Sequence, residues 1–187
     1  MGIVAQLFVS LDGVAESPER WHFPYLDEAM KESVERHLLR AELLLLGGAT
    51  YDIFAASWPN RPRDTVLSPR INSLQKVVVT SRSQQLTWEN STTVSGDLRA
   101  AASRFANAGP VAIVGSIRLV RALLALGLID SLHLMIHPIV LGSGRRLFGS
   151  SPDRIPMDLV RMEELPTGVI DARYAPAKLA RATVESP

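Results

Sequence analysis

Three short apolar runs in this chain each end in small or hydroxyl residues, and this repeated pattern constrains the fold more than any other feature. The runs occupy residues 43–46, 77–79 and 111–114. Short runs of this kind are typical of central strands, although the four leucines at 43–46 could also be helical. They are followed by Gly47-Gly48-Ala49-Thr50, Thr80-Ser81-Arg82 and Gly115-Ser116-Ile117. Helices are predicted directly after the first and third runs, at residues 50–57 and 117–126.

The remaining patterns extend this alternation of strands and helices. We predict strands at residues 3–9, 92–94, 131–141, 157–163 and 169–175, helices at residues 25–40 and 97–107, and a proline-rich surface loop at 59–69. Alternation comes first and consecutive strands come last. This order predicts an α/β fold: a mixed, mainly parallel sheet with an antiparallel C-terminal edge and helices on both faces.

Composition narrows the class of protein. The chain has 187 residues, of which 47% are hydrophobic, and we expect one domain over residues 1–176 with a loose tail at 177–187. Its 20 basic and 19 acidic residues nearly balance, so neither nucleic acid nor an anionic membrane is expected as a partner. The chain has no cysteine, which excludes disulfides and thiolate metal sites. With no apolar segment of about 20 residues and no signal peptide, we expect a cytoplasmic protein.

The three strand ends are the first candidate site. Helix N-termini and glycine backbones suit phosphate groups, and Arg82 could pair with a further phosphate or stack on adenine. Taken alone, each strand end is more often a structural turn, because glycine also serves tight turns. Three in one chain favour a dinucleotide, although the chain lacks the Gly-x-Gly-x-x-Gly fingerprint after its first strand.

The second candidate site is the aromatic-rich segment that runs from Trp21 to Asp27. A carboxylate beside an apolar pocket can hold a heterocycle and assist protonation, so Asp27 is a catalytic candidate. Alternatively, Asp27 only stabilises the N-terminus of the following helix. Asp12, with Gly13, either forms a tight turn or places Val14 and Ala15 over a bound ring.

Other polar residues give weaker signals. His133 and His137 lie on one face of a predicted strand but roughly 13 Å apart, so no metal site is expected and we predict that both are surface or interface residues. Arg145 and Arg146 either bind a substrate phosphate or form a solvated turn. The strand at 131–141 is predicted to be an apolar edge strand, which needs a cover, and this favours a homodimer.

Together these motifs resemble the dihydrofolate-reductase-like superfamily, and most of all the stand-alone proteins similar to the reductase domain of bifunctional riboflavin-biosynthesis deaminase/reductases. The resemblance runs from Ile3 to about Pro176. It is carried by the order and spacing of residues 10–15, 46–51, 78–82, 114–116, 127–132 and 138–148.

The resemblance implies a three-layer fold with an eight-stranded sheet, a homodimer, and NADPH as hydride donor to a small pterin-like or pyrimidine-like substrate. The implied activity is of the dihydrofolate reductase or 5-amino-6-(5-phosphoribosylamino)uracil reductase type. Val14 and Ala15 would approach the nicotinamide. Gly47, Gly48, Ala49, Thr50, Gly115, Ser116 and Ile117 would surround the pyrophosphate, and Thr80, Ser81 and Arg82 would lie along the adenosine.

The resemblance also places Asp12, Trp21 and Asp27 in the catalytic region, with Trp21 and Asp27 at the substrate-loop tryptophan and active-site carboxylate. The family's arginine for the 2′-phosphate is replaced here by Gly48, so NADH is a second possible cofactor. The alternative function is a non-catalytic dinucleotide-binding homologue that acts as a sensor or scaffold.

Overall fold

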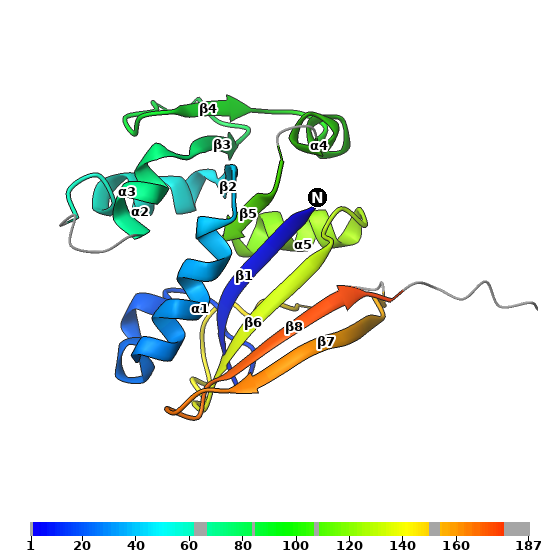
Figure 1. The fold of residues 1–187 in the computed structure, drawn as a ribbon. Coiled ribbons are helices and arrows are strands. Elements are labelled where there is room, and N and C mark those ends of the chain that lie inside the picture. Colours follow the sequence, from blue (N-terminus) through cyan, green and yellow to red (C-terminus); the bar gives the residue numbers. More distant parts are fainter. Residues whose placement is uncertain (1, 62–66, 84, 107–108, 150–153, 178–187) are drawn as a thin grey trace, which may run out of the picture.

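The computed structural model describes residues 2–61, 67–83, 85–106, 109–149 and 154–177. Its eight-stranded sheet has the order β4-β3-β2-β5-β1-β6-β8-β7 (Figure 1). The strands are β1 (Ile3–Ser10), β2 (Leu43–Gly47), β3 (Gln75–Val79), β4 (Ser91–Val94), β5 (Val111–Val114), β6 (Ser131–His137), β7 (Met157–Glu164) and β8 (Ile170–Pro176). The helices are α1 (Glu28–Leu39), α2 (Gly48–Ser57), α3 (Leu67–Ser73), α4 (Leu98–Ala106) and α5 (Ile117–Ala125), with 3-10 turns η1 (Pro18–Arg20) and η2 (Phe23–Tyr25).

The pairing of the strands agrees with the predicted fold class. The pairings among β1 to β6 are parallel. By contrast, β8 is antiparallel to both β6 and β7. The leucine run at 43–46 is a central strand, buried on both faces between β3 and β5. A mainly parallel α/β sheet with an antiparallel C-terminal edge is therefore confirmed.

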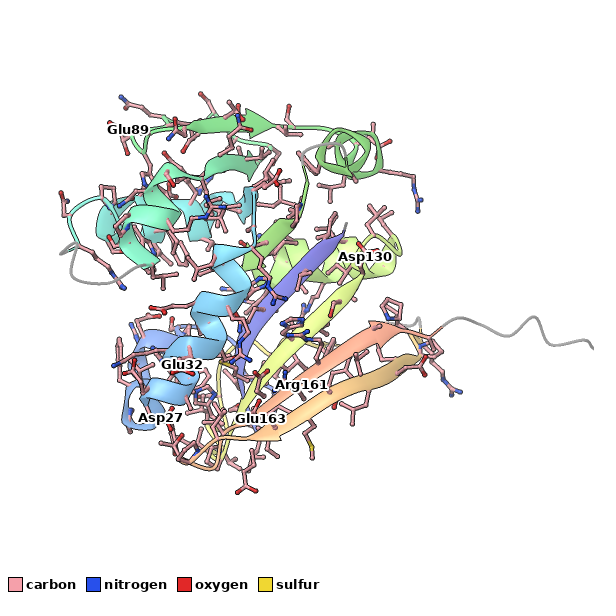
Figure 2. All side chains as sticks on the ribbon, in the orientation of Figure 1. Asp27, Glu32, Glu89, Asp130, Arg161 and Glu163 are labelled. Carbon is pink, nitrogen blue, oxygen red and sulfur yellow. The ribbon has the colours of Figure 1, made fainter. Side chains whose placement is uncertain are left out.

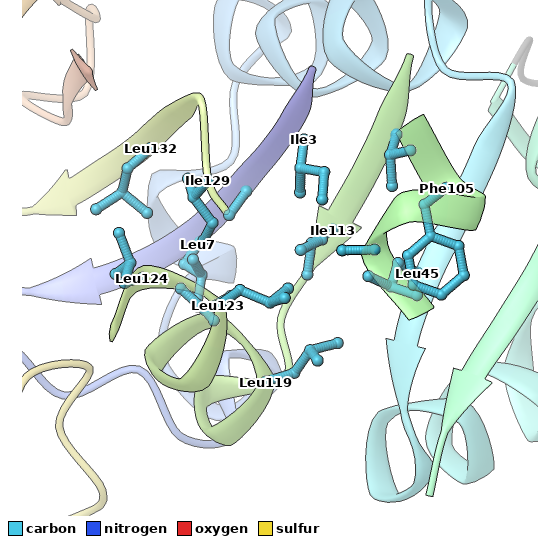
Figure 3. Close-up of a cluster of buried hydrophobic side chains, with 14 of the residues drawn as sticks. Ile3, Leu7, Leu45, Phe105, Ile113, Leu119, Leu123, Leu124, Ile129 and Leu132 are labelled. Atoms are coloured by element: carbon cyan, nitrogen blue, oxygen red, sulfur yellow. The ribbon is translucent and has the colours of Figure 1, made fainter. Parts of the chain in front are cut away.

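Helices cover the two faces of the sheet and make three layers. On one face, α4 and α5 pack against alternate residues of β1, β2 and β5; Figure 3 shows Phe105 of α4 beside Leu45 and Leu123 of α5 beside Leu7. On the other face, α1, α2 and α3 bury Leu38, Tyr51 and Ile71 against Leu44 and Leu46. Since both faces of β2 are covered, its run of leucines needs no polar alternation.

Three element predictions need correction. The helix expected over 25–40 begins at Glu28, because Phe23–Tyr25 forms the separate turn η2 and the side chain of Asp27 caps α1. Helix α3 lies partly in the segment predicted as a loop; Pro69 misled the prediction, although proline is tolerated in the first turn of a helix. Residues 62–66 of that loop lie outside the described residues.

The third correction concerns β6, which was predicted to reach residue 141 and to lie at an edge of the sheet. The strand ends at His137, because Pro138 has no backbone N–H for the ladder. It also lies inside the sheet, between β1 and β8. The edge-strand argument for a dimer is therefore wrong. The predicted tail at 177–187 lies outside the described residues, apart from Ala177.

Candidate functional site

A large cavity lies at the carboxyl ends of β2, β3 and β5. It has a volume of about 1010 Å³ and extends under α1, α2 and α3 and along the segment that follows β1. Eleven of the twelve residues predicted to bind the cofactor line it: Ala15, Gly47, Gly48, Ala49, Thr50, Thr80, Ser81, Arg82, Gly115, Ser116 and Ile117. The exception is Val14, which is 1% exposed and forms a β-bridge with Arg146.

Side-chain hydrogen bonds join two of the strand ends. The Ser116 hydroxyl donates to Thr50 Oγ1 (2.7 Å) and accepts from the Gly47 backbone N–H (2.8 Å). A Cβ on Gly47 would lie 3.1 Å from Ser116 Oγ, which is tighter than ordinary contact. Gly115 and Ser116 both have left-handed backbones, with φ of 75° and 61°. The turn after β5 is thus held against the N-terminus of α2.

Both helices that start at this cavity present their N-termini to it. Within the described residues, neither Gly47 of α2 nor Ser116 of α5 caps its helix with a side-chain hydrogen bond. Arg118, in the first turn of α5, also lines the cavity and has no ion pair with any described residue. Two helix N-termini with their dipoles and the Arg118 guanidinium fit a pyrophosphate. Sequence reasoning missed Arg118, which directly follows Gly115-Ser116-Ile117.

The other end of the cavity is formed by Thr80, Ser81 and Arg82 together with Ser95 and Gly96. Here the Arg82 guanidinium makes an ion pair with Asp52 of α2, with an N–O distance of 2.9 Å. Both side chains are more than half exposed. Any phosphate bound by Arg82 would therefore lie beside a carboxylate, which the sequence did not predict.

The segment after β1 is tied down by Asp12. Its carboxylate accepts hydrogen bonds from Ser10 Oγ (2.7 Å) and from the backbone N–H groups of Leu141 (3.1 Å) and Gly142 (3.0 Å). These bonds, the one from Ser10 foremost, lower the pKa of Asp12 to about 2. Ser10 Oγ in turn accepts from the Val14 N–H (2.9 Å). Asp12 does not line the cavity; it fixes the backbone that carries Val14 and Ala15.

Trp21 and Asp27 also lie outside the cavity lining. The Trp21 indole N–H donates to the Glu16 carbonyl (3.0 Å) and so braces the 16–21 segment, whose Glu16, Ser17 and Glu19 do line the cavity. Asp27 caps α1 by accepting from the Met30 N–H (2.8 Å), which agrees with the simpler of its two interpretations. Figure 2 shows Asp27 at the lower end of α1.

The part of the cavity under α1, α2 and α3 is mainly apolar, and sequence reasoning did not anticipate it. Its lining includes Val34, Leu38, Phe54, Trp58 and Ile71. Two residues of β1, Gln6 and Phe8, complete this apolar lobe from the sheet side. The available signal was Gln6, a single amide in the otherwise apolar run at residues 3–9.

The histidine prediction is wrong, because His133 and His137 are buried, at 6% and 0% exposure. Each faces another histidine under α1 and its preceding turns: the ring centroids of His37 and His133 lie 5.5 Å apart, and those of His22 and His137 6.3 Å apart. Burial lowers the pKa of His37 to about 3 and the pKa values of His22 and His133 to about 4. These residues pair across elements, which spacing along one strand could not reveal.

The two neighbouring arginines after the 141–144 segment have different partners. Arg145 pairs with Glu16 and lines the cavity, whereas Arg146 binds Asp12, so the two neighbouring arginines face different groups. Within the described ranges, no group of three or more His, Asp or Glu side chains could hold a metal ion. None of the helices in those ranges has the length and apolar character needed to cross a membrane.

Solved structures share this architecture. A putative riboflavin biosynthesis protein from Shewanella sp. PV-4 matches 95% of this chain and 100% of its own, with a TM-score of 0.76 and 17% identity. A pyrimidine reductase-like protein from Corynebacterium diphtheriae matches 95% of this chain and 92% of its own, with a TM-score of 0.66 and 16% identity. RibD from Acinetobacter baumannii matches 94% of this chain but only 58% of its own, with a TM-score of 0.67 and 18% identity. This chain therefore spans little more than half of that RibD.

Sequence comparison gives the family. The uncharacterized protein YyaP of Bacillus subtilis is 36% identical over 62 residues, which is 33% of each chain. The family model of the RibD C-terminal domain matches residues 2–170, nearly the whole chain. That match and the shared dihydrofolate-reductase-like fold show that the protein belongs to the RibD C-terminal domain family.

Proposed function

We propose that this protein is a reductase that binds a nicotinamide dinucleotide and transfers hydride to a small pterin-like or pyrimidine-like heterocycle. The observation that carries the proposal is the continuous cavity of about 1010 Å³, which joins a phosphate-type end to an apolar lobe. Such a cavity can place two flat ligands in contact. Membership of the RibD C-terminal domain family and the pyrimidine reductase-like structural neighbour support the same reaction class.

The residues present fit a dinucleotide. Gly47, Thr50, Gly115 and Ser116, with the N-termini of α2 and α5, would hold the pyrophosphate, and Arg118 would add charge. Thr80, Ser81 and Arg82 would lie along the adenosine. When bound, the cofactor supplies the hydride, and the protein positions the two ligands. NADPH is our first choice, with NADH as the second, because Gly48 offers no guanidinium for a 2′-phosphate.

The three catalytic candidates take supporting roles in this proposal. Asp12 is a positioning residue: through Ser10 it holds Val14 and Ala15, and Ala15 lines the cavity. Trp21 holds the 16–21 segment through the Glu16 carbonyl. Asp27 acts on substrate only through α1, which it caps and which brings Val34 and Leu38 to the cavity. The roles of Asp12, Trp21 and Asp27 in catalysis stay predictions.

One observation favours the second candidate function, a non-catalytic dinucleotide-binding sensor or scaffold. None of the three catalytic candidates lines the cavity. Among the described residues of its lining, Glu16 and Glu19 are the only carboxylates, and the pKa of Glu16 is lowered by its hydrogen bonds to Arg145. A binding protein would need no proton donor there.

Two measurements separate these functions. Calorimetric titration with NADPH tests cofactor binding, and loss of the reduced-nicotinamide absorbance with pterin or pyrimidinone acceptors tests turnover. The reductase predicts binding and turnover, whereas the sensor predicts binding alone. The absence of dinucleotide binding would contradict both. Thr93→Ala, on exposed β4 outside the cavity, is the matched control for Thr50→Ala.

Cytoplasmic location, a homodimer and the lack of nucleic-acid partners stay predictions.

A further inference from the structure

Gln6 is an unusual residue in the middle of the sheet. It lies on β1, in register with Val114 of β5 on one side and His133 of β6 on the other. Its side chain is 4% exposed, and the residue lines the large cavity. Alternation along β1 puts it on the same face as Phe8, the face covered by α1. Gln6 therefore lies at the floor of the apolar lobe; because protein atoms shield both polar atoms of its amide, a ligand would reach them through a turn of the side chain.

Neither end of this amide has a hydrogen-bond partner. Both Oε1 and Nε2 are shielded from solvent and unpaired, and Gln6 is the one residue in the described part of the chain with two such side-chain atoms. Buried polar groups nearly always find partners, and an exception calls for a reason. The fold provides partners elsewhere: buried Lys76 donates to the carbonyls of Asn72, Leu74 and Glu89.

The groups around Gln6 do not supply hydrogen-bond partners for its amide. His133, its neighbour across the strand, places Nε2 3.1 Å from Ser131 Oγ. His37, which faces His133 from α1, has an unpaired Nε2 of its own. The lobe itself is lined by aliphatic and aromatic side chains such as Val34, Phe54 and Ile71. A ligand in the lobe is then the natural source of one donor and one acceptor.

A primary amide presents one N–H donor and one carbonyl acceptor side by side. The complementary ligand edge is a ring carbonyl next to a ring N–H, the same two-point pairing by which glutamine reads adenine. We propose that Gln6 binds the lactam edge of a neutral heterocyclic substrate, with Nε2–H donating to the ring carbonyl and Oε1 accepting from the ring N–H. This inference rests on the proposed function and specifies its substrate class.

The charge of the lobe sharpens the choice of ligand. A protonated aminopyrimidine needs a carboxylate partner, because two donors on a cation match two carboxylate oxygens. Asp27 does not line the cavity, Gln6 is neutral, and the lining carboxylates Glu16 and Glu19 come from the 16–21 segment, where Glu16 pairs with Arg145. The lobe therefore favours a lactam over a diaminopyrimidine cation. Methylation of the ring nitrogens removes the donor and leaves the Gln6 carbonyl without a partner.

The test uses lumazine, its 1,3-dimethyl derivative and 2,4-diaminopyrimidine as probes, titrated by fluorescence or calorimetry. We expect lumazine to bind roughly tenfold more tightly than the dimethyl compound, because methylation removes one hydrogen bond and leaves the buried Gln6 carbonyl unpaired. In Gln6→Leu this difference should disappear. In Gln6→Glu the order should reverse in favour of 2,4-diaminopyrimidine. Gln75→Leu, an exposed residue of β3 outside the cavity, is the matched control.

A second readout separates ligand binding from a structural role. If Gln6 serves a ligand, Gln6→Leu removes an unpaired amide, and its thermal midpoint should equal or exceed that of the parent protein. A lower midpoint with unchanged lumazine binding would overturn the inference and indicate a water-bridged contact with the histidines. Failure of the parent protein to bind lumazine would also overturn it. NADPH titration of the same variants tests the proposed function separately, since Gln6→Leu should leave NADPH affinity unchanged.

Discussion

Thr50, Ser116 and Gly47 form the contact that joins two strand ends at the cavity. The sequence put all three among the cofactor-binding candidates, because small and hydroxyl residues recur after each apolar run. It could not show that they touch, since residues 47 and 116 are 69 positions apart in the chain. Their contact makes the predicted phosphate end testable one residue at a time.

The first prediction is that Thr50→Ala weakens NADPH binding roughly threefold to tenfold, the effect of about one hydrogen bond. The substitution leaves the Ser116 hydroxyl without its acceptor. Gly115→Val should weaken binding more, because φ is 75° there and the new side chain meets Thr50, whose Cγ2 would lie 3.5 Å from its Cβ. Calorimetry measures both, with Gly127→Val as the control at an open left-handed position. Unchanged dissociation constants would mean that the site is misplaced.

The second prediction concerns the choice of cofactor at Arg82. A charge-assisted hydrogen bond to the 2′-phosphate contributes about 1.5–3 kcal/mol, so we expect NADPH to be preferred over NADH by roughly one to two powers of ten. Arg82→Ala should remove most of this preference and leave NADH affinity nearly unchanged. Because the Asp52 carboxylate lies 2.9 Å from the guanidinium, Asp52→Asn should raise NADPH affinity.

Titration of these variants with both cofactors measures the preference. Equal binding of NADPH and NADH by the parent protein would contradict the role of Arg82. The sequence offers three other arginines for this role, Arg61, Arg63 and Arg70. Arg70 donates to the Ala41 carbonyl, and Arg61 stacks over Trp58 at 4.0 Å. Arg63 lies outside the described residues.

At the scale of elements, α1 and its preceding turns cover a layer of buried histidines on β6. The sequence correctly gave β6 two distinct faces, but it could not tell which element would cover the polar one. Helix α1 does so: His37 meets His133, and Met30 packs on Met135. Polar residues on one face of a strand are therefore compatible with a face that a helix covers, and not only with an exposed face.

The third prediction follows from this layer. Burial lowers the folded-state pKa of His22, His37 and His133 below the ordinary 6.5. Between about pH 4 and 6.5 the unfolded chain then binds more protons than the folded protein, so stability falls as pH falls through that window. The slope is about 1.4 kcal/mol per pH unit for each histidine. Asp12, whose folded pKa is also lowered, acts in the same direction but only below its ordinary value of 3.8.

Urea unfolding between about pH 7 and pH 5 measures this slope. His37→Gln should make the slope shallower by the contribution of one histidine. Arg36→Gln, an exposed neighbour on α1, should leave it unchanged. A parent protein whose free energy of unfolding is constant over this range would show that the histidines are not buried as described.

At the scale of the whole molecule, β7 is the edge that stays open at the antiparallel end of the sheet. Leu159, Val160 and Met162 on this strand are 55%, 61% and 60% exposed. Figure 2 shows Arg161 and Glu163 on the same strand. Apolar edge strands need a cover. The sequence predicted a dimer through residues 131–141, but β6, the strand in this segment, lies inside the sheet. We therefore predict that the dimer forms through β7.

The fourth prediction is that light scattering gives twice the 20.4 kDa mass of one chain. Val160→Lys should shift the protein toward the monomer, because a buried lysine at the interface would lose its hydration. Thr93→Lys, on the opposite edge strand β4, should remain dimeric. A monomeric parent protein at micromolar concentration would contradict the dimer, and a dimeric Val160→Lys variant would move the interface away from β7.

The sequence by itself determined the local structure and the chemistry of the strand ends. Apolar runs, turn residues and caps act over a few residues, so β2, the Asp97-capped start of α4 and the glycine turn after β5 could all be predicted. The family motifs added the fold and the candidate cofactor residues, eleven of which line the cavity.

Only the tertiary structure decided which side chains meet across elements. Asp12 turned out to tie the 141–142 backbone, Asp27 to cap α1, and the histidines to pair beneath that helix. The proposed role of Gln6 follows from its burial beside a cavity, which the spacing of residues along β1 does not predict. Burial, unpaired polar atoms and long-range ion pairs arise from packing, and packing is set by distant parts of the chain acting together.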